Sequence, residues 1–324
     1  MLNAAIFGMG RWGQNLVNSV QGKSDKIKFK TGIVRTVERY ESFAKENGLE
    51  LSNDYAAVLA DSSIEAVVLA TPNSLHADHI KMAAAAGKHI FVEKPFTLTR
   101  ASAEAAAKAC TDAKITLAVG FNRRFRPALI DMRQAIVEGR IGNILHIEGQ
   151  HAGPTGYNIP PDVWRAERSH NPVGGMAARG IHTLDAMIHL GGDIRSVYAL
   201  SDRREIPIDV DDTSSMLFQF KNGITGYLGV IFATADFWRI HVFGSKGWIE
   251  MRSEHALAFS DLDGNVEEKK YDPTDTVKDE LEAFANAASG GKAYPVSLAE
   301  AIHGSAVFEA VDKSAATGDK VMIP

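Results

Sequence analysis

The chain has 324 residues, of which 45% are hydrophobic and 23% charged, and its formal net charge is −5. This length favours two domains, or one large α/β unit, with a sizeable core. The mild acidity offers no basic surface to a phosphate backbone, and no stretch reaches the roughly 18 apolar residues of a membrane helix, which argues against nucleic acid and membrane as partners. The single cysteine, Cys110, excludes an internal disulfide framework and favours a reducing, cytoplasmic location.

Short β-like runs alternate with helical runs over the first 120 residues. The strand candidates are LNAAIF, KFKTGIV, EAVVLA, KHIFVE and ITLAVG, which begin at residues 2, 28, 65, 88 and 115. The runs between them, at 11–20, 38–47, 76–86 and 100–110, have helical spacing and many strong helix formers. This alternation predicts a doubly wound α/β domain over residues 1–120, with a parallel sheet covered by helices on both faces.

The rhythm changes after residue 143 to long β-like runs with turn pairs between them. These runs are ILHIEGQHA, SVYALSD, TSSMLFQF, ITGYLGVIFA, FWRIHVFG and WIEMRS, and they predict a large, mostly antiparallel sheet in a second, α+β domain over residues 121–324. Helical stretches at 174–190, 275–289 and 297–316 are expected to cover one face of it. The other face is left open for a partner subunit, which predicts a homodimer or homotetramer through this sheet. The last helices or the C-terminal KVMIP could instead pack back on the first domain.

The segment IFGMGRWG has G-x-G-x-x-G spacing directly after the first strand and at the start of a helix. Glycines there permit a tight turn and a close backbone approach, and the free N–H groups of the helix start attract a pyrophosphate. The alternative is a tight turn without a ligand. The position in the fold favours a dinucleotide cofactor, bound in this turn by Gly8, Met9, Gly10, Arg11, Trp12 and Gly13.

Arg35 and Thr36 follow the second strand, where an NAD-preferring site usually offers an acidic residue to the ribose hydroxyls. A guanidinium there would pair with a 2′-phosphate, and Arg39 is a candidate second cation. The sequence therefore favours NADP(H) over NAD(H). The alternative is that Arg35 is an ordinary surface arginine.

Two further motifs end strands at the same predicted sheet edge. ATPN covers Ala70, Thr71, Pro72 and Asn73, which are expected to line the nicotinamide ribose; His76 begins the next helix and is either a cofactor contact or a packing residue. EKP covers Glu93, Lys94 and Pro95. The Lys94 ammonium could hydrogen-bond a substrate hydroxyl, and the Lys94–Pro95 bond is a candidate for a cis peptide.

These motifs, with GFNRRFRP at 120–127, WR at 164–165 and the GIHTLD segment that ends at Asp185, resemble the glucose-fructose oxidoreductase, inositol dehydrogenase and MocA (Gfo/Idh/MocA) family. The resemblance covers nearly the whole chain. It implies an N-terminal Rossmann domain, a C-terminal domain whose open sheet is used for dimerisation, and hydride transfer between a nicotinamide and a secondary alcohol or ketone. No metal is implied, and Asn122 is expected beside the cofactor.

The resemblance assigns acid/base or substrate-orienting work to His182, and in the family an aspartate commonly lies one helical turn earlier. In this chain Ala178 occupies that position. His182, Asp185 and His189 share a helical stripe at the margin of the core face. Either Lys94 or His182 could take the substrate proton, or both could hold one oxygen. Asp185 could replace the missing partner or face a structural neighbour, and His182 could itself be a packing residue.

Several arginines follow the first domain or lie near His182. Arg123, Arg124, Arg126, Arg165, Arg168 and Arg179 either select an anionic, less hydroxylated substrate or, for some of them, merely pair with Asp and Glu across the subunit. The segment HAGPTGYNIPPDVWR, residues 151–165, is either a loop that closes over the substrate or a plain connection. The predicted substrate-side residues are Arg123, Tyr157, Trp164, Arg165, Arg179 and His182.

The sequence thus predicts an NADP(H)-dependent oxidoreductase that acts on a CH–OH or keto group of a sugar, a cyclitol or a related, possibly carboxylated, cyclic diol. Two other functions occur on the same fold. One is an NAD-dependent glycosidase that oxidises, eliminates, adds water and reduces again without releasing the cofactor. The other is a non-catalytic regulator that senses a dinucleotide.

Overall fold

The computed structural model describes all 324 residues, and the chain forms two compact units. The first unit comprises Met1–Thr97, Ala101–Asn122 and Asp275–Ile302. The second comprises Leu98–Arg100, Arg123–Thr274 and His303–Pro324. No helix in either unit is both long enough and apolar enough to cross a bilayer.

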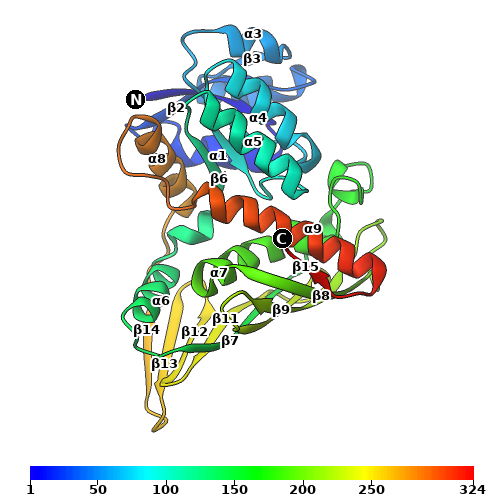
Figure 1. The fold of residues 1–324 in the computed structure, drawn as a ribbon. Helices are drawn as coiled ribbons and strands as arrows, with labels where there is room; N and C mark the ends of the chain where they lie inside the picture. Colours follow the sequence, from blue (N-terminus) through cyan, green and yellow to red (C-terminus); the bar gives the residue numbers. More distant parts are fainter. The chain divides into compact units, whose positions relative to one another are not determined.

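The first unit, whose residues 1–97 run from blue to cyan in Figure 1, is built on a six-stranded parallel sheet in the order β3-β2-β1-β4-β5-β6. Its strands are β1 (Leu2–Phe7), β2 (Ile27–Ile33), β3 (Glu50–Ser52), β4 (Ala66–Leu69), β5 (His89–Glu93) and β6 (Leu117–Gly120). Its helices are α1 (Arg11–Val20), α2 (Glu41–Asn47), α3 (Tyr55–Ala60), α4 (His76–Ala85), α5 (Arg100–Asp112) and α8 (Thr276–Ala288). This strand order is that of the Rossmann fold and confirms the predicted doubly wound domain. The short β3 and α3 were not predicted.

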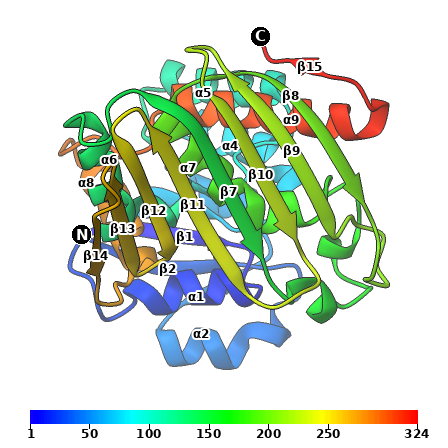
Figure 2. The same cartoon turned by 90° about the horizontal axis from the view of Figure 1, so that it is seen from below.

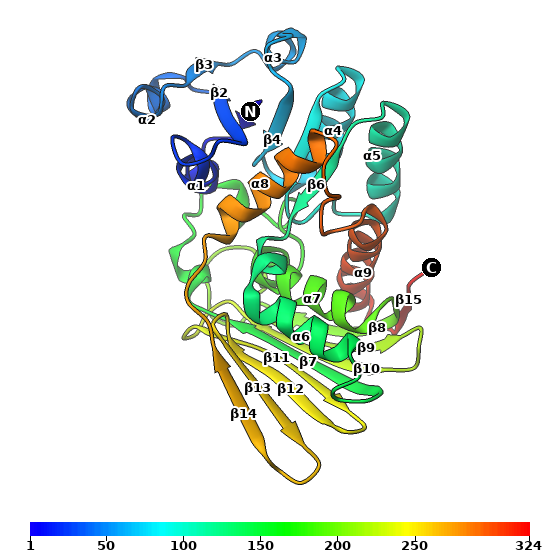
Figure 3. The same ribbon diagram turned by 90° about the vertical axis from the view of Figure 1, so that its left-hand side faces the viewer.

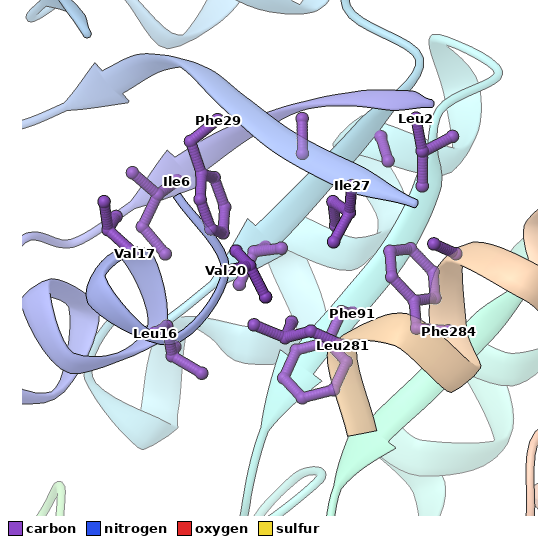
Figure 4. Close-up of a cluster of buried hydrophobic side chains, with 14 of the residues drawn as sticks. Leu2, Ile6, Leu16, Val17, Val20, Ile27, Phe29, Phe91, Leu281 and Phe284 are labelled. Carbon is purple, nitrogen blue, oxygen red and sulfur yellow. The ribbon is translucent and has the colours of Figure 1, made fainter. Parts of the chain in front are cut away.

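Helix α8 belongs to the first unit, although its residues follow the predicted domain boundary by more than 150 positions. Its apolar side chains Leu281 and Phe284 are buried in the core beside α1 and β5, and the rings of Phe284 and Phe91 lie 5.8 Å apart (Figure 4). The helix expected over 275–289 on the second sheet is therefore found elsewhere. The change from alternating strands and helices to consecutive strands marks where the first sheet ends. It does not show that a later helix packs on that first sheet.

The second unit is built on a nine-stranded sheet in the order β14-β13-β12-β11-β7-β10-β9-β8-β15. Its strands are β7 (Ile144–Ala152), β8 (Ile194–Asp202), β9 (Thr213–Phe220), β10 (Thr225–Ile231), β11 (Phe237–Gly244), β12 (Gly247–Ser253), β13 (Ala256–Asp261), β14 (Val266–Lys270) and β15 (Val321–Met322). All neighbours are antiparallel except β7 and β10. The mostly antiparallel sheet is confirmed, whereas β13, β14 and β15 were not predicted.

Helices cover one face of this sheet only. Helices α6 (Pro127–Val137) and α7 (Ile181–Gly191) lie on the same side of it in Figure 3, and Figure 2 shows the uncovered face. The part of α9 (Leu298–Thr317) that belongs to this unit is tied to β8, because the Ala199 N–H donates to Ser314 Oγ (2.9 Å). The C-terminal KVMIP pairs with β8 through β15, within the second unit. It does not pack back on the first.

The strands of this sheet alternate as the sequence pattern requires. On β9, Met216, Phe218 and Phe220 are buried, while Leu217 between them is exposed. Successive side chains of a strand point to opposite faces, so the apolar set of β9 packs on the face that the helices cover. The open face nevertheless carries large exposed apolar side chains, among them Tyr198, Leu200 and Leu217.

Candidate active site

The glycine turn between β1 and α1 has the geometry of a dinucleotide site. Gly8 has φ +91°, a conformation that favours glycine, and a Cβ on Gly13 would collide with the carbonyl oxygen of Gly8. A Cβ on Gly10 would meet nothing within 4 Å, and no side chain caps the first turn of α1. The open space and the uncapped N–H groups fit a pyrophosphate approaching the backbone. The residues present therefore fit the predicted cofactor.

The non-glycine residues of the turn differ in how far their side chains are exposed. Arg11 is exposed and Trp12 is half-buried against the first unit's core. The Met9 side chain is 1% exposed and packs into the space left by Gly32, so only its backbone is available to a cofactor. The predicted contact of Met9 is therefore limited to its main chain.

Arg35 and Thr36 are exposed immediately after β2. Arg35 makes no ion pair in the structure. Arg39 is also exposed, with its guanidinium carbon 5.7 Å from the centroid of the Tyr40 ring. Both guanidinium groups are therefore open to a phosphate.

His76 was predicted as a cofactor contact or a packing residue, and the structure makes it a structural residue. Its ring is fully buried, with Nδ1 2.9 Å from the Pro95 carbonyl oxygen and Nε2 3.1 Å from that of Thr71. Burial lowers the pKa of His76 to about 4, so the ring is neutral at physiological pH. The His76 imidazole therefore links the backbone of the loop after β4 to the backbone of the loop after β5.

Lys94 lies at the carboxyl end of β5, half-buried, between buried Glu93 and Pro95. The Lys94 N–H donates to Glu93 Oε2 (3.3 Å), and the Lys94–Pro95 peptide is cis, as predicted. Asn122 follows β6, and its Nδ2 donates to Thr276 Oγ1 (3.4 Å). Because the strands are parallel, the glycine turn, Ala70, Lys94 and Asn122 lie at one edge of the sheet, where ligands bind in such folds.

His182 lies in the first turn of α7 and is 7% exposed. The preceding segment, Met176–Gly180, is a π-helix, in place of the α-helix predicted over 175–190. Gly180 approaches β10 so closely that a Cβ would lie 2.6 Å from a Val230 methyl group. The wide turn and the small residues let this segment pack directly on the sheet; such turns are frequent at functional sites.

Ala178 packs against a small apolar cluster formed by Ala166, Ile206, Ile208, Val210 and Phe232. A carboxylate at this position would lie against these apolar side chains. The alanine is therefore consistent with its surroundings in this chain.

Asp185 is the partner of Arg124. Arg124 Nε and Nη2 donate to the two carboxylate oxygens of Asp185 at 2.6 and 2.8 Å, and Arg124 Nη1 lies 2.6 Å from His189 Nδ1. The Arg124 and Asp185 side chains are only 2% and 8% exposed. Asp185 could replace the missing partner of His182 or face a structural neighbour. The structure supports the second alternative, with Arg124 as that neighbour.

Three further arginines are paired within the chain. Arg123 and Arg126 both reach Glu254, at 2.7 and 2.5 Å, and Arg168 pairs with Asp211 at 2.6 Å. Two carboxylates thus compensate most of the charge of these three arginines, and one positive charge is left at the Arg123, Arg126 and Glu254 cluster. They agree with the alternative in which some of these arginines pair with Asp and Glu across the subunit.

Arg179 fastens the start of the 151–165 segment. It donates to Thr155 Oγ1 (2.8 Å) and to the Ala152 carbonyl oxygen (3.1 Å), and it pairs with Asp236 at 2.9 Å. These contacts give Arg179 a structural role, and its substrate contact stays a prediction.

Two aromatic residues of the same segment have mostly local contacts. Tyr157 is 52% exposed, and its hydroxyl donates to the Ala233 carbonyl oxygen (3.3 Å). The Trp164 ring meets His170 edge-on at 6.2 Å, and the exposed Arg165 stacks over its other side at 4.3 Å. Their substrate contacts remain predictions.

A polar cluster next to His182 was not predicted from the sequence. Trp238 Nε1 donates to Thr183 Oγ1 (3.2 Å), which lies 3.4 Å from His151 Nδ1, and Arg123 lies 5.8 Å from the Trp238 ring. His151 and Trp238 are paired across β7 and β11. The register of the two strands creates this cluster, and the sequence does not contain that register as a local pattern.

Comparison with known proteins gives the class of protein. A model described as "Oxidoreductase family, NAD-binding Rossmann fold" matches residues 2–121, and the GFO/IDH/MocA C-terminal domain matches residues 129–250. The chain is an NAD(P)-dependent dehydrogenase. It belongs to the Gfo/Idh/MocA oxidoreductase family.

Curated relatives and solved structures cover nearly the whole chain. A D-xylose 1-dehydrogenase (NADP(+)) from Haloferax volcanii is 30% identical over 300 residues, which are 89% of each chain. An inositol 2-dehydrogenase from Rhizobium meliloti is 30% identical over 98% of each chain. A levoglucosan dehydrogenase solved with NADH and levoglucosan is 25% identical, with a TM-score of 0.88 over 100% of this chain and 99% of that one.

Proposed function

We propose that the protein transfers a hydride between NADP(H) and a CH–OH or keto group of a neutral sugar, cyclitol or related cyclic diol. The observation that carries this proposal is the single sheet edge that holds both the glycine turn and Lys94. The names of the relatives, which act on D-xylose, inositol and levoglucosan, favour a polyhydroxylated substrate. Five arginines of the second unit pair with four carboxylates, so most of their charge is compensated within the chain, which favours a neutral substrate over a carboxylated one.

The nicotinamide ring supplies the hydride chemistry when the dinucleotide is bound. The task of the protein is then to orient the substrate and to move one proton at the reacting oxygen. We assign Lys94 to this oxygen, because its ammonium can donate a hydrogen bond to a hydroxyl or carbonyl group and stabilise charge that develops there. His182 is the second candidate for the proton, and it performs this work without an aspartate at position 178.

Titration of the purified protein with NADPH, followed by turnover on a panel of keto sugars, inositols and cyclic diols, tests the proposal. Stoichiometric change of free NADPH with at least one panel member supports it. Turnover of a glycoside with no net change of NADPH would favour the redox-elimination mechanism. Tight binding without any turnover would favour a dinucleotide sensor.

We propose that Arg35 selects NADP(H) through the 2′-phosphate. Replacing Arg35 by serine is expected to weaken NADPH binding about tenfold, the loss of one charge-assisted contact of about 1.4 kcal/mol, and to leave NADH binding within about twofold. Fluorescence titration of both cofactors measures the effect. Arg39→Ser removes the candidate second cation, and its NADPH affinity is expected to fall less. Equal weakening of NADH and NADPH by Arg35→Ser would contradict the proposal.

We propose that the chain forms a homo-oligomer through the open face of the nine-stranded sheet. Tyr198, Leu217 and Tyr227 are register partners across β8, β9 and β10, and they form a row on that face. Light scattering after size exclusion is expected to give a dimer or tetramer, and Leu217→Glu is expected to shift it toward the monomer while NADPH binding persists. A monomeric wild-type protein at micromolar concentration would contradict this.

A further inference from the structure

Helix α8 presents one stripe of side chains to the interior of the first unit. Thr276, Glu280 and Phe284 follow each other at intervals of four residues, and all three are buried. Phe284 meets Phe91 of β5, and Thr276 accepts a hydrogen bond from Asn122. A glutamate, completely buried, therefore occupies the middle of an inward stripe whose two neighbours have clear packing or hydrogen-bonding roles.

The Glu280 carboxyl group is unusual even for a buried acid. Neither of its oxygens has a hydrogen-bond partner in the structure. The charged groups that act on it are Glu93 and Lys94. The other charges of this helix lie toward solvent: Glu282 pairs with Lys26 at 2.9 Å, and Asp279 is exposed.

Glu93 comes from the strand that α8 packs against. It lies two residues after Phe91 on β5, so both side chains are on the same face of the sheet. Its strand neighbour is Gly120, and a Cβ there would lie 3.0 Å from Glu93 Oε1. The absence of a side chain at 120 thus makes room for the Glu93 carboxyl group, which is 6% exposed.

Two carboxylates in one buried region cannot both be ionised without a large free-energy cost. Burial and the charge of Glu93 raise the pKa of Glu280 well above its ordinary value, while the Lys94 ammonium lowers it. The interaction is reciprocal, so an ionised Glu280 raises the affinity of Lys94 for its own proton. The pair and Lys94 therefore form one titrating system.

We propose that Glu93 and Glu280 together carry one proton at neutral pH, called the shared proton below, and that the charge of this pair sets the protonation of Lys94. Glu280 is then a positioning residue, which acts through Lys94 and Glu93 and does not touch the substrate. The effect on turnover rests on the proposed function, whereas the shared proton does not. The two parts can therefore be tested apart.

The shared proton is tested without any activity. In protein labelled with ¹³C at the glutamate side-chain carboxyl carbon, one carboxyl signal of the wild type is expected to stay protonated at pH 7 and to vanish in Glu280→Gln. The control Glu282→Gln removes a signal that is already ionised at this pH. If every glutamate is ionised at pH 7 in the wild type, the pair does not exist, whatever the enzyme does.

Stability against pH gives a second readout of the pair. An acid with a raised pKa in the folded state stabilises that state at low pH, and this contribution is lost as the pH rises above its ordinary value. The Tm of Glu280→Gln is therefore expected to rise relative to that of the wild type between pH 5 and pH 9, whereas Glu282→Gln shows no such trend. A Tm difference independent of pH would contradict the proposal.

The link to Lys94 is tested by the pH profile of kcat/KM. In Glu280→Gln the amide cannot ionise, so Lys94 loses a negative neighbour at high pH, and the alkaline limb is expected to move about one unit lower. The rate near pH 7 changes little, because the amide resembles the protonated acid. If NMR establishes the shared proton but the alkaline limb does not move, only the proposal that the pair sets the protonation of Lys94 is contradicted. If no substrate is found, the proposed function fails and the NMR result stands.

Discussion

Replacing Lys94 by methionine is expected to lower kcat/KM about 10²- to 10⁴-fold, the usual contribution of one positioned proton donor or acceptor. Methionine keeps much of the side-chain volume and removes the charge. The affinity for NADPH is expected to change less than about fivefold, because the glycine turn and the loop after β4 remain intact. Steady-state kinetics and fluorescence titration on the same preparation separate the two effects.

Lys81→Met is the matched control for this experiment. Lys81 lies on α4 and forms an exposed pair with Asp78 at 2.7 Å, so its removal is expected to leave both kinetics and Tm unchanged. If Lys94→Met retains more than a tenth of the wild-type kcat/KM, Lys94 is not the main proton-handling group. His182→Ala, measured beside it, would then be expected to carry the larger loss.

Replacing Asp185 by alanine is expected to destabilise the protein by about 3–5 kcal/mol, because it leaves the Arg124 guanidinium buried with its main counter-charge removed. For a domain of this size, that corresponds to a fall in Tm of roughly 10 °C. Differential scanning calorimetry measures it. Asp193→Asn, at an exposed pair with Lys221, is the control and is expected to cost less than about 1 kcal/mol.

The same variant decides between the two interpretations of Asp185. A structural role predicts that the double variant Arg124→Met/Asp185→Leu recovers most of the stability, because neither buried charge then remains. A catalytic partnership with His182 predicts instead that Asp185→Ala lowers kcat at an unchanged Tm. This second result would contradict the structural role of the Arg124–Asp185 pair.

The first unit could be predicted from the sequence because its determinants are local. The alternation of short apolar runs and helices of 10 to 13 residues gives the doubly wound sheet, and the three glycines of the turn mark the phosphate end of it. Strand β3 has only three residues and α3 six, too few for periodicity to show. The packing of α8 on the first unit could not be predicted, because its apolar residues join a core made of segments distant in the sequence.

The candidate site was predicted less well where its partners are distant in sequence. Arg124 and Asp185 are 61 residues apart, and Arg123 meets Glu254 from a hairpin much further along the chain. A cluster of arginines in a sequence looks like a surface for anions until the carboxylates that neutralise it are known. Likewise, Glu280 is an ordinary residue of an amphipathic helix until its burial beside Glu93 is seen.

The absence of an aspartate before His182 is a further case. In the sequence, Ala178 is visible only as the loss of a partner. In the structure the alanine packs against a cluster that includes Phe232 and Ile206, so a carboxylate would be placed among apolar side chains. The substitution therefore agrees with its local packing, and under the proposed function the proton chemistry is assigned to Lys94 and His182.

Transfer of deuterium from NADPH labelled at the hydride position of the nicotinamide ring to a keto sugar or keto inositol tests the central claim most directly. Mass spectrometry of the product is expected to show one deuterium bound to carbon for each NADPH consumed, with the rate of transfer lowered about 10²- to 10⁴-fold in Lys94→Met. Tight NADPH binding with no deuterium in any product of the panel would contradict the assignment of this chain as a working dehydrogenase of sugars and cyclitols.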